Sequence, residues 1–153
     1  MTTHHADVAT SKPRQVYVWD PLGSADLALV KEIMADCRVV GAMHLAWAMS
    51  RKDGLERAFW IFRSGTGFAT GRVWTGSADK TPLSAYDERL SLGASLQSVV
   101  ANYHTHPGSD WQWAYPSWQD RNYNRFSSTI GFLQSEFGFS FGRTVHPERR
   151  TSP

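Results

Sequence analysis

Two histidines separated by one residue have the clearest chemical potential in this sequence. His104 and His106 flank Thr105, and Pro107 follows them. Alternate side chains of a strand project from the same face, so an extended segment would present both imidazoles together and point Thr105 the other way. Neutral imidazole is a common ligand of zinc. The spacing therefore predicts a pair of metal ligands.

A serine and an aspartate follow after a gap of ten residues beyond His106. A helix beginning near Ser117 would place Ser117 and Asp120 on one side, and Asp120 could then supply an oxygen ligand. Two imidazoles, one carboxylate and an open position are the usual surroundings of a catalytic zinc.

Each half of this pattern also has an ordinary structural interpretation. The histidines could end a strand before a Pro-Gly turn, and Ser117 with Asp120 could form a start similar to a capping box. The occurrence of both halves within one short stretch favours metal binding.

Hydrolysis at a zinc site also needs a carboxylate that moves protons between water and the leaving group. The chain offers five glutamates: Glu32, Glu56, Glu88, Glu136 and Glu148. Glu56 opens a predicted strand, where it could lie beside the histidine strand in one sheet. A solvent-facing charge on that strand is the alternative interpretation.

Two helical segments are expected before this strand. Apolar residues at helical spacing predict a helix over about residues 25–37, with Ser24 as its N-cap. Residues 41–49 continue this helix after a break or form a second one. Residues 51–54 then predict a turn.

Runs of aromatic and β-branched residues predict strands over about residues 15–19, 55–63, 68–75, 98–103, 129–133 and 137–141. The glycine-rich residues 64–67 would join the second and third strands as a hairpin turn; a phosphate loop should instead open a helix. A short helix is expected from about Ser117 to residue 125, and residues 83–96 remain ambiguous. The order predicts an α+β fold, a small twisted mixed sheet with flanking helices.

Length and composition limit the class of protein. The 153 residues suit one domain, expected at residues 14–145, between a polar arm at residues 1–13 and a polar tail at residues 146–153. The single cysteine, Cys37, excludes an internal disulfide and a four-cysteine zinc site, and its apolar neighbours predict a buried thiol.

The same composition gives expectations about location and partners. No apolar run is long enough to span a bilayer and no secretory signal is evident, so we expect a protein made in the cytoplasm that does not bind membranes. The net charge is +2 and the basic residues are scattered, which argues against a nucleic-acid partner.

The His-x-His-Pro and Ser-x-x-Asp pattern that begins at His104 resembles the JAMM motif of the JAB/MPN metalloproteases. The local Tyr-His-Thr-His sequence is especially similar to the JAMM-like domains of bacterial polymorphic (Rhs-type) toxins. The resemblance covers roughly residues 24–143. It implies a JAB/MPN-like fold with layering like that of cytidine deaminases.

By this resemblance, His104, His106 and Asp120 would be zinc ligands, Glu56 the acid/base, and Ser117 a hydrogen-bond donor to the tetrahedral oxyanion. The resemblance implies a zinc-dependent hydrolase that cleaves a peptide or isopeptide bond of a protein or peptide substrate. It also implies a toxin or effector in interbacterial competition, delivered by a secretion system and met by an immunity or adaptor protein. The alternative is a catalytically inactive JAMM-like module that binds a protein partner through its tryptophan-rich loop.

That loop separates the two halves of the motif, and it is longer than the commonest JAMM spacing. Four aromatic residues mark it as a candidate substrate-binding wall: Trp111, Trp113, Tyr115 and Trp118. Rigid aromatic surface often binds extended peptides or apolar side chains. Equally, these residues could form a lid that packs on the domain's own core.

Other enzymes with a His-x-His pair fit less well. The metal-dependent amidohydrolases place the pair in an eight-fold barrel of about 250 residues, for which this chain is too short. Sites of the metallo-β-lactamase type need further aspartate and histidine directly after the pair, where Pro107 and Gly108 stand.

Overall fold

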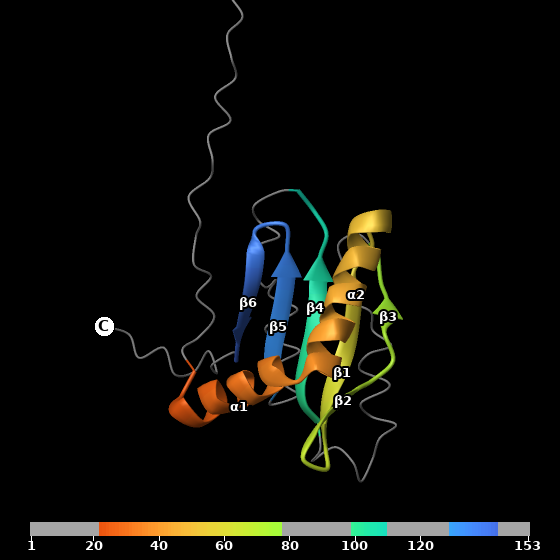
Figure 1. The fold of residues 1–153 in the computed structure, drawn as a ribbon. Coiled ribbons are helices and arrows are strands. Elements are labelled where there is room, and N and C mark those ends of the chain that lie inside the picture. Colours follow the sequence, from red (N-terminus) through yellow and green to blue (C-terminus); the bar gives the residue numbers. More distant parts are fainter. Residues whose placement is uncertain (1–21, 78–98, 110–128, 144–153) are drawn as a thin grey trace, which may run out of the picture.

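The computed structural model describes residues 22–77, 99–109 and 129–143, which form two helices and six strands (Figure 1). The helices are α1 (Ser24–Ala35) and α2 (Cys37–Asp53). The strands are β1 (Arg57–Ser64), β2 (Gly67–Thr70), β3 (Trp74–Thr75), β4 (Val99–His106), β5 (Ile130–Ser135) and β6 (Gly138–Gly142). The expected α+β class is confirmed. The strand expected at residues 15–19, the helix after Ser117 and residues 83–96 lie outside the described residues.

All six strands belong to one mixed sheet, in the order β2-β1-β4-β5-β6, with β3 also paired to β1. β4 and β5 run parallel, and the other neighbouring strands are antiparallel. The start of β1 and the ends of β4 and β5 therefore lie at the same end of the sheet. Helix α2 also ends at this end of the sheet (Figure 1).

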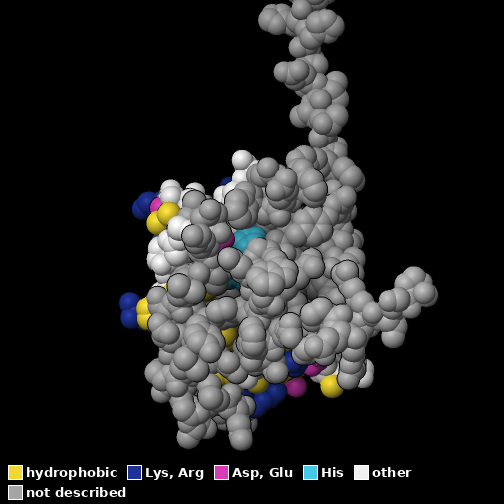
Figure 2. All heavy atoms as spheres, turned by 180° about the vertical axis from the view of Figure 1, so that it is seen from behind, with side chains coloured by type: hydrophobic (Ala, Val, Ile, Leu, Met, Phe, Trp, Pro, Cys, Tyr) yellow, Lys and Arg dark blue, Asp and Glu magenta, His cyan; other side chains and the backbone are white. Residues whose placement is uncertain are grey.

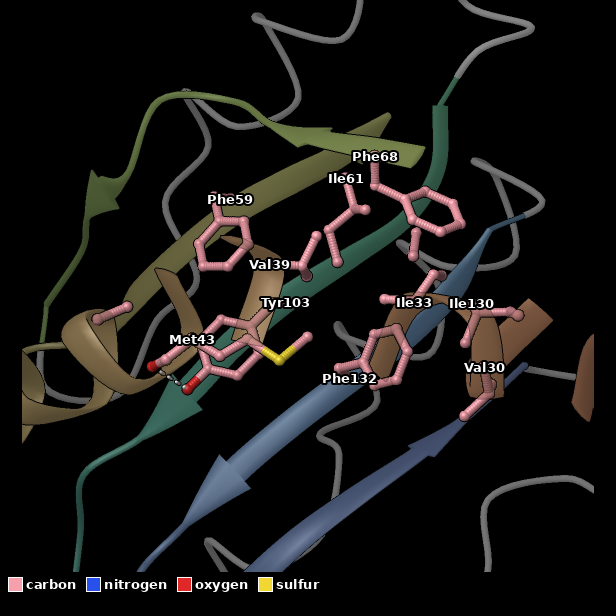
Figure 3. Close-up of a cluster of buried hydrophobic side chains, with 12 residues drawn as sticks. Val30, Ile33, Val39, Met43, Phe59, Ile61, Phe68, Tyr103, Ile130 and Phe132 are labelled. Atoms are coloured by element: carbon pink, nitrogen blue, oxygen red, sulfur yellow. Dashed lines mark hydrogen bonds between the residues drawn. The ribbon is translucent and has the colours of Figure 1, made fainter. Parts of the chain in front are cut away.

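Both helices cover one face of the sheet, and the main core lies between these two layers (Figures 1 and 3). The helices contribute Val30, Ile33, Val39, Met43 and Ala46, and the sheet contributes Phe59, Ile61, Phe68, Ala101, Tyr103, Ile130 and Phe132. Full burial of one such large apolar side chain is worth about 1.5–3 kcal/mol. The sheet is thereby held firmly against α1 and α2.

Tyr103 carries the one hydroxyl drawn in this cluster, and it donates a hydrogen bond to the carbonyl oxygen of Met43 at 3.1 Å (Figure 3). Burial raises the pKa of Tyr103 well above its ordinary value. The phenol therefore stays neutral, and its hydrogen bond links β4 to α2.

The start of α1 corrects one prediction. Gly23, and not Ser24, is the N-cap, so this helix end has no side-chain cap hydrogen bond. The amide of Leu27 donates to the carbonyl oxygen of Gly23 at 3.0 Å, so Ser24 is already the first helical residue. Glycine is tolerated at an N-cap because it adopts extended backbone angles at little cost.

The predicted turn at residues 51–54 is wrong for its first three residues, since α2 continues through Asp53. Arg51 and Lys52 lie in the last turn, where positive charge complements the helix dipole. Gly54 ends the helix with a φ of 73°, and its amide donates to the Ser50 carbonyl at 2.8 Å. Glycine suits this left-handed position because it has no Cβ.

Two further expectations need correction. Cys37 is exposed at the start of α2, because the helix turns its buried side, with Val39 and Met43, toward the sheet. The strand expected over residues 68–75 is divided into β2 and β3, with an interruption at residues 71–73. At this interruption the amide of Gly71 donates to the carbonyl oxygen of Trp60 at 2.7 Å.

Asp36 joins the two helices to the edge of the sheet. It is the N-cap of α2, and its carboxylate accepts hydrogen bonds from the backbone amides of Arg38 at 3.0 Å and of Phe68 in β2 at 3.1 Å. The Arg38 guanidinium also lies 3.3 Å from its carboxylate. The Arg38 side chain, together with these two amides, holds the pKa of Asp36 below its ordinary value.

We expect the Asp36→Asn variant to be less stable than the wild-type protein at neutral pH. The folded-state pKa of Asp36 is lowered, so its charge stabilises the fold above the unfolded-state pKa, and this contribution is lost as the pH falls through the folded-state pKa. The difference in unfolding free energy should therefore shrink below about pH 4. Urea unfolding followed by circular dichroism measures it.

Glu32→Gln is the matched control for this measurement. The Glu32 carboxylate forms an exposed ion pair with Arg63 at 3.2 Å, and exposed pairs contribute little. Asparagine is itself a good N-cap, so a loss at neutral pH reports the charge of Asp36. Equal stability of Asp36→Asn and wild type at neutral pH would contradict this account.

Candidate functional site

Strand β4 presents the two histidines on one face. His104 and His106 alternate with Thr105, so both imidazoles project from the same side of the sheet. Their ring centroids are 4.9 Å apart, with an angle of 69° between the rings. His104 is 3% exposed and His106 is 1% exposed. The structure therefore places two neighbouring imidazoles in a buried environment.

Glu56 lies beside this pair because of the register between β1 and β4. Ala58 is opposite His104 in an antiparallel ladder, so the residue two before Ala58 falls opposite His106. Glu56 Oε1 is 3.7 Å from His106 Nε2, and Glu56 is only 1% exposed. The alternative interpretation of Glu56 as a solvent-facing charge is therefore wrong.

This group lies on the face of the sheet opposite the helices. Tyr103, which alternates with the histidines along β4, belongs to the core under α1 and α2. On β1, Phe59 belongs to the same core, whereas Trp60 packs with Val99 in a second cluster. Figure 2 looks at this second face and shows histidine and acidic side chains side by side.

The backbone of Glu56 is held by the segment that follows β3. Its amide donates to the carbonyl oxygen of Ser77 at 2.9 Å, and its carbonyl oxygen accepts the amide of Gly76 at 2.9 Å. These bonds continue the pairing of β1 with β3, in which Arg57 is opposite Thr75. Glu56 is therefore placed by a hydrogen-bonded frame, and such frames position functional groups more closely than open loops do.

The next residue, Arg57, fastens this segment to the end of α2. Its side chain is 5% exposed and forms an ion pair with Asp53. Arg57 Nη1 also donates to the carbonyl oxygen of Leu55 at 3.0 Å. The Arg57 guanidinium, followed by the amide of Leu55, holds the pKa of Asp53 below its ordinary value.

Sequence reasoning missed the part played by Thr105, which it assigned only to the opposite face. Thr105 is fully buried, and its hydroxyl lies 2.6 Å from that of Ser50 in α2. Ser50 follows Met43 and Ala46 at helical spacing, so it shares their buried side. A hydroxyl residue at a core-facing position of each element is the signal that could have revealed this contact.

The structure thus brings Glu56, His104 and His106 together from two separate parts of the sequence. Six other predicted site residues lie outside the described residues: Ser117, Asp120, Trp111, Trp113, Tyr115 and Trp118. Within the described ranges, no three His, Cys, Asp or Glu side chains form a group that could hold a metal ion. The predicted third ligand, Asp120, is not among the residues to which this finding applies.

Comparisons of this chain with protein-family models, with curated proteins and with solved structures found no match. Neither helix described here has the length and apolar character needed to cross a membrane.

We expect Glu56 and His106 to be energetically coupled. Glu56→Gln and His106→Gln each alter one partner of a buried contact, so their effects on the free energy of unfolding should not add. Groups in contact typically couple by about 0.5–3 kcal/mol, and burial strengthens the coupling. A double-mutant cycle by urea unfolding of the metal-free protein measures this energy.

The pair formed by Arg51 and Glu136 is the reference cycle. Its two charged groups lie 3.2 Å apart but are exposed, so its coupling should be the smaller of the two. Additive effects of the Glu56 and His106 substitutions would show that the short distance between these groups has no energetic consequence.

Proposed function

We propose that this chain is a JAMM-like zinc hydrolase that cleaves a peptide or isopeptide bond. The observation that carries the proposal is the placement of the Glu56 carboxylate 3.7 Å from His106 Nε2, in a buried site on the face that also holds His104. A His-x-His pair and a distant glutamate are the parts that the JAMM resemblance requires to meet. Their meeting supports the proposal independently of the motif's spacing.

The donor atoms available in this site suit zinc. Two buried imidazoles lie together, and imidazole nitrogen is preferred by zinc over magnesium. In the proposal His104 and His106 hold the metal, and Asp120 is the third ligand. When bound, zinc would act as a Lewis acid on the scissile carbonyl and lower the pKa of water.

In the proposal, Glu56 is the general base and acid. Its carboxylate accepts one proton from the attacking water while the water oxygen bonds to the carbonyl carbon. The bond from that carbon to the leaving nitrogen then breaks, and Glu56 returns the proton to this nitrogen. Ser117 donates a hydrogen bond to the oxyanion formed in between.

Burial contributes to this chemistry in two ways. Glu56 and His106 are each 1% exposed, so bulk water does not screen their electrostatic interactions. A buried carboxylate also keeps its proton for the leaving group instead of losing it to solvent. Both effects require that the site open only to the substrate.

The remaining parts of the proposal depend on the motif. The JAB/MPN-like assignment of the fold is supported by the mixed sheet and by the motif on β4. The tryptophan-rich loop, which begins a few residues after His106, would bind the protein or peptide substrate. A role as a toxin made in the cytoplasm, delivered by a secretion system and neutralised by an immunity protein follows from the resemblance to toxin domains.

We expect about one zinc ion per chain in gently purified protein, because two histidines and a carboxylate suffice for a catalytic site. The double variant His104→Ala/His106→Ala should contain none. Elemental analysis measures the zinc content, and circular dichroism checks that the variant is folded. His44→Ala, which removes an exposed histidine of α2, should keep its zinc. Absence of metal from the wild-type protein, even after zinc is offered, would refute the hydrolase proposal.

We expect Glu56→Gln to lower kcat by about 10²–10⁴-fold while zinc remains bound, since a general base contributes about this much. A panel of peptide and isopeptide-linked substrates, assayed by mass spectrometry, measures the rate. Glu136→Gln removes an exposed carboxylate that pairs with Arg51 and should leave kcat unchanged. A zinc-loaded wild-type protein that cleaves nothing, and whose partner binding survives Glu56→Gln, would favour the inactive binding module.

A further inference from the structure

We propose that the hydroxyl of Thr105, the residue between the two histidines, holds Glu56 in place against His106. The inference deepens the proposed function and rests on it for its catalytic consequence. Thr105 projects from the face opposite the histidines and acts through Glu56. It is therefore a positioning residue.

The Thr105 hydroxyl makes three contacts, with the amide and the carbonyl oxygen of Arg57 and with the hydroxyl of Ser50. The Arg57 amide donates to Thr105 Oγ1 at 2.8 Å, and the carbonyl oxygen of Arg57 lies 3.5 Å from the same hydroxyl. A hydroxyl has one proton and two acceptor lone pairs. The hydroxyl of Ser50 is 2.6 Å away, and one of the two hydroxyls donates its proton to the other.

This hydroxyl takes the place of a main-chain partner at the start of β1. The backbone ladder between β1 and β4 begins with Ala58 opposite His104. One residue earlier, both polar backbone groups of Arg57 meet the Thr105 side chain. The connection between the two strands is thereby extended to the residue next to Glu56.

The other end of the contact is anchored in α2. Ser50 is fully buried and lies on the side of α2 that packs into the core through Met43 and Ala46. The ion pair between Arg57 and Asp53 joins the same segment to the same helix end. Thr105 thus ties the start of β1 to a helix whose position the core already determines.

Removal of the hydroxyl should displace the carboxylate. Thr105→Val keeps the shape of the side chain but leaves the Arg57 amide and the Ser50 hydroxyl without this partner in a buried place. Buried polar groups seek other partners, so we expect the segment at Glu56 to shift. A misplacement of about 1 Å can cost about 10²-fold in rate. Thr105→Ser keeps the hydroxyl and should keep the geometry.

The first test needs neither metal nor substrate. The ring nitrogens of His106 are observed by long-range proton–nitrogen NMR in the zinc-free protein at one fixed pH. Glu56→Gln should move these signals, and Thr105→Val should move them in the same direction. Thr105→Ser should leave them at the wild-type positions.

Two further variants make this test decisive. Tyr103→Phe removes another buried hydroxyl from the same face of β4. Unchanged His106 ring signals in this variant would show that the shift in Thr105→Val reports the position of Glu56 and not a general loss of stability. Ser50→Ala removes the far end of the contact and replaces Thr105→Val if the latter does not fold. The proposal is overturned if the signals stay at the wild-type positions in the folded Thr105→Val or Ser50→Ala variant, or in Glu56→Gln.

The second test applies to the catalytic consequence. In the zinc-loaded protein, Thr105→Val should lower kcat at least tenfold and change zinc affinity less than threefold, and Thr105→Ser should restore the rate. An unchanged kcat in Thr105→Val would overturn the inference. A wild-type protein that hydrolyses nothing would instead contradict the proposed function, whereas the ring signals would still decide the role of Thr105.

Discussion

The antiparallel pairing of β1 with β4 is the constraint on which the site depends. Its register sets Ala58 opposite His104, and this alignment brings Glu56 opposite His106. A slip by one residue would turn Glu56 to the helix-covered face and bring Arg57 to the histidines. The register is protected because the same slip would turn Phe59 and Ile61, which are fully buried in the core, away from the helices.

The two faces of the sheet have different roles: one forms the main core, and the other carries the candidate site. One face carries the large apolar side chains that bind it to α1 and α2, and alternate positions along the same strands carry the polar group on the other face. Burying a carboxylate and two imidazoles is costly in free energy unless they interact. The apolar face supplies the stability that lets this polar group persist beside it.

The local elements could largely be predicted from the sequence, whereas their meeting points could not. Periodicity identified both helices, the hairpin around Gly65 and the strand of the histidines, since each is decided by neighbours in the chain. Ser24 and residues 51–53 were assigned wrongly because competing signals for capping and turning lie within a few residues of each other. Cys37 was expected inside because its neighbours are apolar, but the helix turns it outward.

The contacts of Thr105 show why the rest escaped prediction. Its partners Arg57 and Ser50 are 48 and 55 residues away in the sequence. Such contacts depend on how sheet and helix are stacked, which no local pattern specifies. The JAMM resemblance suggested Glu56 as the acid/base, but a motif carries no information about which distant residues hold that side chain in place.

The link from the last turn of α2 through Thr105 to the start of β1 also affects the local unfolding of the protein. Helix ends usually fray, at a free energy far below that of global unfolding. Here the last turn carries Ser50, whose hydroxyl contacts that of Thr105, and Asp53, which forms an ion pair with Arg57 next to Glu56. Fraying of this turn would release the segment around Glu56 as well, so the helix end and the site form one cooperative unit. The working temperature of the site would then be limited by the local stability of one helical turn, below the temperature at which the whole fold melts.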